Sequence, residues 1–429
     1  MTHAVEVLER ESPSPRSRGF RVTTFSSLQH RDFRYLWVGT LFMSAGQWVQ
    51  QITLGWLLYD LTGSSVLLGL LNGLRALPFL ISGPVAGVIA DRADRKKSML
   101  GSQYLLLVTA LIMGILVAGG WVEVWHLMVF AVVTGAAWSL NQPVRQAIVP
   151  NLIPRKDLIN AQALNSTAFN LNKVLGPLLG GLLIAHSGAA GNFYVQAVAY
   201  AGVMAMVYIM NVPKVTPSGP RVSAWADMKE GWRYCWREPL VLAILICGLI
   251  PMILAFPYQA LMPVFQKDVL EAGPEALGVL FAAPGVGGMV ALVLLASFGH
   301  RIGRLGRLML GGLLMLGISL MLFASTRDLW LSALTLTIVG ASQVMYNNTA
   351  HILLQQIVPD ELRGRVNSIY MLDHGLAPAG ALVAGIATHF FGAPWTIGAM
   401  GALVLLLGLI VAWKAPGLTR WRPGVAEEA

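Results

Sequence analysis

The chain has 429 residues, of which 55% are hydrophobic and only 12% are charged. Because a soluble domain carries about 25% charged residues, this composition excludes an ordinary soluble fold and indicates a surface that mostly faces lipid. The formal net charge of +9 does not predict a nucleic-acid partner, since no stripe of interleaved aromatic residues accompanies the basic ones.

The first segment, residues 1–34, is polar and contains six arginines, so we expect a cytosolic tail rather than a cleavable signal. About 20 helical residues are needed to cross a hydrocarbon core roughly 30 Å thick. On that criterion the sequence predicts an all-α membrane protein with two six-helix bundles, residues 35–211 and 239–413. The twelve predicted spans are Leu36–Tyr59, Val66–Ala90, Ser98–Gly119, Val124–Gln146, Asn160–His186, Phe193–Asn211, Pro239–Leu261, Ala276–Phe298, Leu305–Ser325, Leu329–Gln355, Val366–Phe391 and Pro394–Trp413.

A charged hairpin, Gly87 to Lys97, joins the second and third spans. Its spacing, Gly-x-x-x-Asp-Arg-x-x-Arg-Lys, resembles the signature hairpin between helices 2 and 3 of the major facilitator superfamily. The resemblance implies a latch that packs against helix 11 and closes the cytosolic side. Its residues are Gly87, Asp91, Arg92 and Arg95. The alternative is a solvated charge cluster that only directs membrane insertion.

Basic residues fall almost entirely in alternate segments, which predicts that these segments and both tails, residues 1–34 and 414–429, are cytosolic. The basic residues of these segments are Arg92, Arg95, Lys96, Lys97, Arg145, Arg155, Lys156, Arg221, Arg233, Arg237, Arg301, Arg304, Arg307, Arg363 and Arg365. Between the two halves, residues 212–238 begin with prolines and end in a Trp-rich basic piece. This composition predicts a linker with a helix lying on the membrane surface. Cys235 lies in the linker and Cys247 in a span, so no disulfide is expected.

The two halves repeat in sequence. Leu68-Gly69 recurs as Leu277-Gly278 with a shift of 209, and Gly135 recurs as Gly340 with a shift of 205. A parallel duplication of six spans is the internal symmetry of superfamily transporters.

A run of small residues in the fifth span, Gly176, Pro177, Gly180 and Gly181, resembles the helix-5 motif of superfamily exporters, with Asn172 in place of the usual upstream glycine. Small residues let helices cross closely, and proline bends a helix. The motif favours export over import, although simple helix packing also explains it.

Three formal charges, Arg75, Lys173 and Asp373, fall inside predicted spans. Each costs about 2.5–3.5 kcal/mol near the bilayer centre, so each is expected to face protein or water. The resemblance places helix 2 beside helix 11, which predicts proton coupling through Asp373 with Arg75 and the adjacent His374; a permanent ion pair is the alternative. Lys173 is expected to bind either an anionic substrate group or a backbone carbonyl.

Uncharged amides gather in the first, fourth and tenth spans, which line the central cavity in the superfamily. Gln47, Gln50 and Gln51 have the spacing of one helix face. The predicted substrate cavity contains Gln47, Gln50, Gln51, Asn141, Gln142, Lys173, Tyr258, Gln343 and Asn347. Bonding between helices is the alternative for the amides. Tyr258 lies beside Phe256 and Pro257, where the seventh span is expected to break, and Asp60 is assigned to a turn.

Three stretches resemble most closely the superfamily branch of enterobactin (siderophore) exporters and macrolide efflux proteins: Tyr59-Asp-Leu-Thr-Gly-Ser-Ser65, Asn141-Gln-Pro-Val-Arg-Gln-Ala147 and Ala161-Gln-Ala-Leu-Asn-Ser166. The resemblance implies a monomeric, proton-driven exporter of a small-molecule substrate, a siderophore or lipophilic drug, in the lipid bilayer of the bacterial inner membrane. The alternatives are a lysophospholipid flippase or importer of the same fold, and a membrane receptor or scaffold that does not transport. Phosphate-loop and zinc-protease motifs are missing from the sequence, so no enzyme activity, cofactor or metal is expected.

Overall fold

A computed structural model describes residues 25–92, 94–212, 224–298, 303–372 and 376–421, and over these residues it contains helices and no strands. Side chains are described in the same ranges except for residues 79–92, 224–228 and 371–372. In this part of the chain, eight helical segments are long and apolar enough to cross a membrane, and two shorter apolar helices accompany them. The predicted all-helical membrane fold is confirmed, whereas the count of twelve spans stays a prediction.

The N-terminal half forms one bundle, in which α1 packs against α5, α2 against α4, and α3 against both α4 and α5. Its elements are η1 (Ser26–Gln29), α1 (Arg31–Thr62), α2 (Ser65–Arg92), α3 (Arg95–Ala118), α4 (Val124–Leu152), η2 (Arg155–Asp157) and α5 (Leu158–Ile209). Gly188 interrupts α5 with φ 68° and ψ −179°, a conformation that residues with a Cβ rarely adopt. The Asn192 amide donates to the Gly180 carbonyl at 2.9 Å, so the two parts of α5 lie side by side as a hairpin.

The C-terminal half forms a second bundle, in which α9 and α10 pack against α11, and α14 packs against α7, α10 and α13. Its elements are α7 (Pro239–Leu254), η3 (Phe256–Leu261), α8 (Met262–Val264), η4 (Phe265–Val269), α9 (Pro274–Phe298), α10 (Leu305–Ser325), α11 (Leu329–Ile357), α12 (Asp360–Leu372), α13 (Ala377–Phe391), α14 (Ala393–Lys414) and α15 (Pro416–Arg420). The expected break in the seventh span is present, because α7 ends at Leu254 and a 3₁₀ segment containing Pro257 follows.

The linker contains α6 (Ala224–Arg237), which packs on α12 and α7 of the second bundle. Glu230 of α6 forms an ion pair with Arg365 of α12 at 2.8 Å. Trp232 and Trp236 are exposed, and the position of this helix on the membrane surface stays a prediction. Cys235 and Cys247 are both free and buried.

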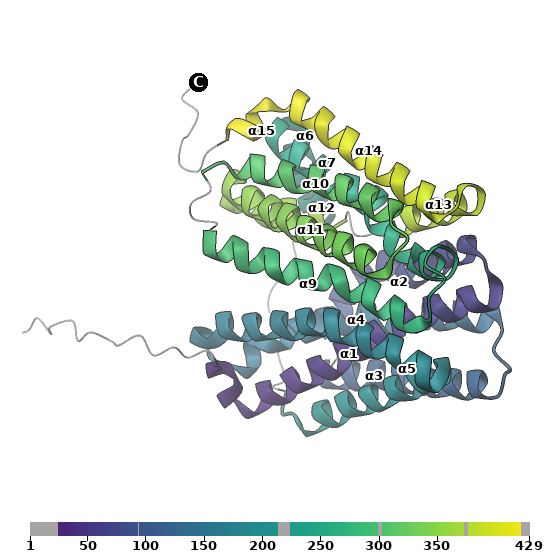
Figure 1. Cartoon of the computed structure of the whole chain (residues 1–429). Helices are drawn as coiled ribbons and strands as arrows, with labels where there is room; N and C mark the ends of the chain where they lie inside the picture. Colours follow the sequence, from purple (N-terminus) through teal and green to yellow (C-terminus); the bar gives the residue numbers. More distant parts are fainter. Residues whose placement is uncertain (1–24, 93, 213–223, 299–302, 373–375, 422–429) are drawn as a thin grey trace, which may run out of the picture.

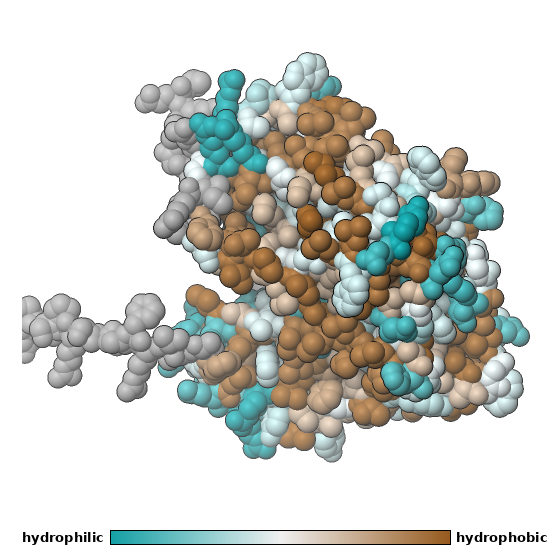
Figure 2. Space-filling view, viewed as in Figure 1, coloured by the Kyte–Doolittle hydropathy of each residue, from teal (hydrophilic) through white to brown (hydrophobic). Residues whose placement is uncertain are grey.

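The two bundles meet along two seams, α2 against α13 and α5 against α9 (Figure 1). The first and last described segments of the chain lie at one end of the molecule, hereafter the termini side (Figure 1). The seam contacts gather toward the opposite side, and the bundles diverge toward the termini side (Figure 1). On the face shown in Figure 2, apolar side chains cover much of both bundles, which suits a surface in contact with lipid.

Each seam contains a close contact between a glycine of one helix and a backbone carbonyl of the other, and the two contacts are equivalent. A Cβ on Gly69 of α2 would lie 2.6 Å from the Ala381 carbonyl of α13, and a Cβ on Gly278 of α9 would lie 2.7 Å from the Pro177 carbonyl of α5. Gly69 and Gly278 are the glycines related by the shift of 209. The duplication seen in the sequence therefore reappears as two equivalent helix crossings.

Candidate substrate cavity

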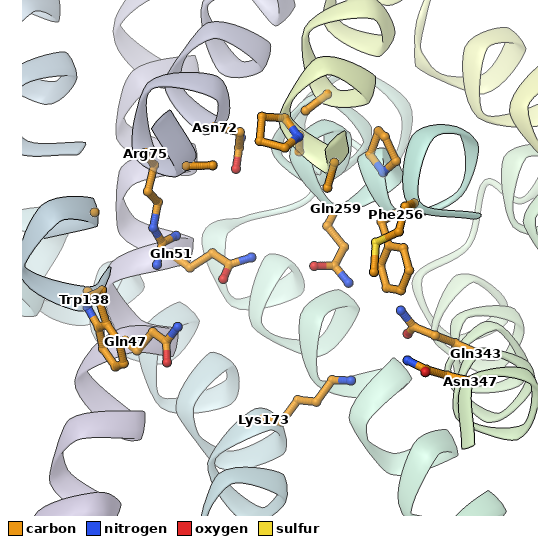
Figure 3. Close-up of a pocket in the computed structure, with 18 of the residues that line it drawn as sticks. Gln47, Gln51, Asn72, Arg75, Trp138, Lys173, Phe256, Gln259, Gln343 and Asn347 are labelled. Atoms are coloured by element: carbon orange, nitrogen blue, oxygen red, sulfur yellow. The ribbon is translucent and has the colours of Figure 1, made fainter. Parts of the chain in front are cut away.

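A cavity of about 520 Å³ lies between the two bundles. Its size falls in the range of about 300–1,000 Å³ that is typical of small-molecule sites. Figure 3 shows polar side chains entering it from both bundles. Its polar lining consists of Gln47, Gln51, Asn72, Arg75, Lys173, Gln259, Gln343, Asn347 and Asn348. Trp138, Met252, Phe256, Pro257, Val344 and Pro378 supply most of the apolar lining.

The structure brings together six of the predicted functional residues: Gln47, Gln51, Arg75, Lys173, Gln343 and Asn347. Gln47 and Gln51 come from α1, whereas Gln343 and Asn347 come from α11 of the other bundle. Both pairs are separated by one helical turn, so each pair lies on one face of its helix. The cavity is therefore lined by matching amide pairs from the two halves.

Four predicted cavity residues lie elsewhere: Gln50, Asn141, Gln142 and Tyr258. Gln50 is fully buried, because one residue along a helix turns a side chain by about 100° away from Gln51. The Asn141 amide donates to the Ser102 hydroxyl of α3 at 2.8 Å, inside the first bundle. Gln142 is partly buried, outside the cavity lining, and Tyr258 is 1% exposed, whereas its neighbours Pro257 and Gln259 reach the cavity.

Sequence patterns also left out several lining residues, among them Asn72, Trp138 and Gln259. Asn72 precedes Arg75 by three positions on α2, a spacing that would have placed both on one face. Trp138 precedes Asn141 and Gln142 on α4, and Gln259 follows the expected helix break. The spacing of Asn72 and Arg75 could have identified Asn72. Residue spacing does not show which face of α4 carries Trp138 toward the cavity, or how the 3₁₀ segment orients Gln259.

The predicted hairpin latch falls largely outside the described residues. The α2 helix runs through Gly87 to Arg92, but the side chains of Asp91 and Arg92 are not described, and neither are Asp373 and His374. Arg95 donates to the Ala147 carbonyl of α4 at 3.1 Å. Asp94 caps α3 by accepting from the amides of Lys96 and Lys97. The described part of the hairpin is thus fixed to its own bundle.

The predicted charge pattern counted Arg145 among the cytosolic loop residues, but the structure places it within a helix. It is 4% exposed inside α4, which continues to Leu152, beyond the predicted end of the span. Its guanidinium donates to the Leu36 carbonyl of α1 at 2.8 Å and to the Thr40 hydroxyl. These contacts make Arg145 part of the α1–α4 packing.

A polar clasp, formed by Tyr59, Asp60, Lys267 and Asp268, joins the two bundles on the side opposite the termini. Lys267 pairs with Asp60 at 2.8 Å, and the Tyr59 hydroxyl donates to the Asp268 carboxylate. The sequence assigned Asp60 only to a turn; its partner lies 207 residues away, beyond any local pattern. The clasp and the seams therefore hold the two bundles together on this side of the cavity.

The helix-5 motif lies at the α5–α9 seam, next to the cavity. A Cβ on Gly181 would lie 2.8 Å from the Pro274 carbonyl and 2.9 Å from the Gly278 Cα, and a Cβ on Gly176 would lie 2.7 Å from the Trp48 Cβ of α1. Gly180 faces Val49 of α1. The motif therefore packs α5 against one helix of each bundle.

The sequence of this chain is similar to those of known membrane transporters. A family model described as "Transmembrane secretion effector" matches residues 22–419. The staphyloferrin A transporter of Staphylococcus aureus is 26% identical over 380 residues, covering 88% of this chain and 94% of that protein. The macrolide efflux protein A of Streptococcus pyogenes is 22% identical over 386 residues, with coverage of 88% and 94%. The enterobactin exporter EntS of Escherichia coli is 26% identical over 370 residues, with coverage of 84% and 83%.

Solved structures show the same fold at low sequence identity. The nucleoside transporter NupG superposes with a TM-score of 0.74 at 12% identity, covering 89% of this chain and 99% of that one. A bacterial homologue of the iron transporter ferroportin in an inward-facing state gives a TM-score of 0.69 at 17% identity, with coverage of 89% and 98%.

Proposed function

Because the chain belongs to the transmembrane secretion effector family of the major facilitator superfamily, we propose that it is a secondary active exporter of small organic molecules, siderophores or lipophilic drugs. The observation that carries this proposal is the polar cavity between two bundles, whose described contacts include two seams and the clasp on the side opposite the termini. Rocking of the bundles about such a site gives alternating access. The chain is a multi-pass membrane transporter, not an enzyme.

We assign the termini side to the cytosol of the bacterial inner membrane, with the clasp on the outer side. The basic residues of η2 and α6 support this orientation, because positive charge is retained on the cytosolic side. In this orientation we infer an inward-facing state, because the clasp and the close glycine contacts of the seams lie on the outer side.

Transport by the purified protein in proteoliposomes tests the proposal. Vesicles with the protein are expected to move members of a panel of siderophores, macrolides and dyes faster than empty vesicles. If every compound class moved at the rate of empty vesicles, the export function would be excluded.

We propose that Gly87, Asp91, Arg92 and Arg95 form a cytosolic latch, which the signature spacing supports. Asp91→Asn is expected to reach the membrane in normal amounts and to transport poorly, because the neutral amide loses the charge interactions that close the cytosolic side. Immunoblotting of membranes and initial transport rates measure the two effects separately. Transport equal to the unaltered protein would contradict the latch.

We propose that efflux is coupled to protons through Asp373, with Arg75 and His374. Asp373→Asn is expected to abolish efflux driven by a pH gradient, because the amide binds no proton, and to retain efflux down a substrate gradient. Proteoliposomes with the membrane potential held at zero measure this difference. Asp360→Asn, which alters the exposed carboxylate paired with Arg363 on α12, is the matched control. Full pH-driven efflux by Asp373→Asn would contradict the coupling.

A further inference from the structure

The cavity lining is electropositive. Arg75 and Lys173 both belong to it, and none of its described lining residues is acidic. Figure 3 shows Arg75 entering beside Gln51 and Lys173 extending toward Gln343 and Asn347. The two cations therefore approach the same space from two helices.

Neither cation has an ion-pair partner among the described residues. A charge at membrane depth is costly, and charges that persist there mark substrate or ion pathways. Arg145 shows the contrasting case in this chain, because it is buried and hydrogen-bonded to α1. Arg75 and Lys173 instead line a cavity, and Asp373, the proposed coupling partner of Arg75, lies outside the described residues.

Both cations are placed by the helices that form the seams. The Arg75 carbonyl of α2 packs against Gly135 of α4, with no room for a Cβ on that glycine. Lys173 lies one turn before Gly176 on α5, and its carbonyl would lie 3.2 Å from a Cβ on Gly285 of α9. A solute that contacts both cations would bridge α2 and α5, the helices through which the first bundle meets the second.

The rest of the lining indicates what else the solute carries. Gln47, Gln51 and Asn347 offer hydrogen bonds without charge, whereas Trp138 and Phe256 offer aromatic surface. We propose that the cavity binds amphipathic organic anions, with Arg75 and Lys173 each holding an anionic group against an aromatic or apolar body. Cations of the same size are disfavoured, because they would lie beside two like charges.

This inference deepens the proposed export function and rests on it, since it names the charge class of the exported solute. An inside-negative membrane potential drives an anion outward. Export of this class is therefore possible without a pH gradient.

Two dyes with the same ring system and opposite charge test the inference: carboxyfluorescein, an anion, and rhodamine 6G, a cation. Fluorescence anisotropy with the full chain in lipid nanodiscs measures equilibrium binding. The unaltered protein is expected to bind carboxyfluorescein about tenfold or more tightly than rhodamine 6G, a difference of about 1.4 kcal/mol. Tighter binding of rhodamine 6G would overturn the inference.

Charge-neutral variants identify the residues responsible. Arg75→Gln and Lys173→Gln are each expected to weaken carboxyfluorescein binding about tenfold, that is by about 1.4 kcal/mol, and to leave rhodamine binding unchanged or improved. Lys173→Arg is expected to retain the anion preference, and Lys414→Gln, at the exposed end of α14, is the control for net charge. Unchanged carboxyfluorescein binding in both Gln variants would refute the role of the two cations.

Binding and transport fail in distinguishable ways. If nanodiscs bind carboxyfluorescein through Arg75 and Lys173 while proteoliposomes move no compound, the anion site is supported and the export function fails. If proteoliposomes export rhodamine 6G and not carboxyfluorescein, export is supported and the anion inference fails.

Discussion

Gly181→Leu is expected to lower the initial rate of efflux about tenfold or more, since about 1.4 kcal/mol against one state changes its population tenfold. Gly181 lies where α5 of the first bundle meets α9 of the second, with Pro274 and Gly278 in contact. A leucine there cannot be accommodated without separating the two helices, because the nearest atoms belong to backbone. The substitution therefore opposes closure of the side that carries the clasp. Efflux rates in proteoliposomes give the measurement.

A cross-linking assay reports the same effect without a substrate. Cysteines placed at Asp60 and Lys267, whose side-chain ends meet at 2.8 Å in the clasp, are expected to be joined by a short bifunctional thiol reagent in the otherwise unaltered protein and to be joined less with Gly181→Leu. Gly101→Leu is the matched control, because a Cβ on Gly101 of α3 meets open space. Equal cross-linking in all three proteins would show that the seam does not govern closure.

The internal repeat places an equivalent glycine contact at the other seam. Gly385 of α13 packs on the Ser65 carbonyl of α2, as Gly181 of α5 packs on the Pro274 carbonyl of α9. Ser65 and Pro274 are related by the shift of 209 found in the sequence. Gly385→Leu should therefore reproduce the loss of transport and of cross-linking.

The sequence located the cavity but not its full lining. Arg75 and Lys173 were found because a charge in an apolar span is conspicuous, and Gln47 and Gln51 because their spacing puts them on one face. The same spacing rule placed Gln50 in the cavity incorrectly. Three amides on one side of a helix do not show which of them faces the partner bundle. In the seventh span, the 3₁₀ geometry of η3 changes the angle per residue, so that Gln259 and not Tyr258 reaches the cavity.

The contacts between the two halves could not be predicted from local sequence patterns, for a different reason. The clasp joins Asp60 to Lys267, and each residue alone is an ordinary charge at the end of a helix. The seams could be predicted in part, because small residues such as Gly181 and Gly278 indicate that two helices cross closely. Small residues do not name their partners, however, and only the repeat suggested that the crossings come in equivalent pairs.

Gly340→Leu is expected to destabilise the C-terminal bundle by about 3 kcal/mol, at the upper end of the usual cost of overpacking. Gly340 of α11 packs directly on the Pro284 carbonyl of α9, so that a Cβ would collide with backbone. The equivalent glycine of the first bundle, Gly135, packs on the Arg75 carbonyl in the same way. Because a carbonyl within a helix cannot move as a side-chain end can, relief requires the helices to separate, and the bundle loses its packing.

Thermal unfolding of the purified protein in detergent measures this cost. Gly340→Leu is expected to unfold at a clearly lower temperature and to be recovered in lower yield from membranes, whereas Gly311→Leu is expected to behave as the unaltered protein, because a Cβ on Gly311 of α10 meets open space. Gly135→Leu should destabilise the first bundle similarly and also weaken carboxyfluorescein binding, since it displaces the backbone that holds Arg75. Equal unfolding temperatures for Gly340→Leu and Gly311→Leu would contradict the close crossing of α9 and α11.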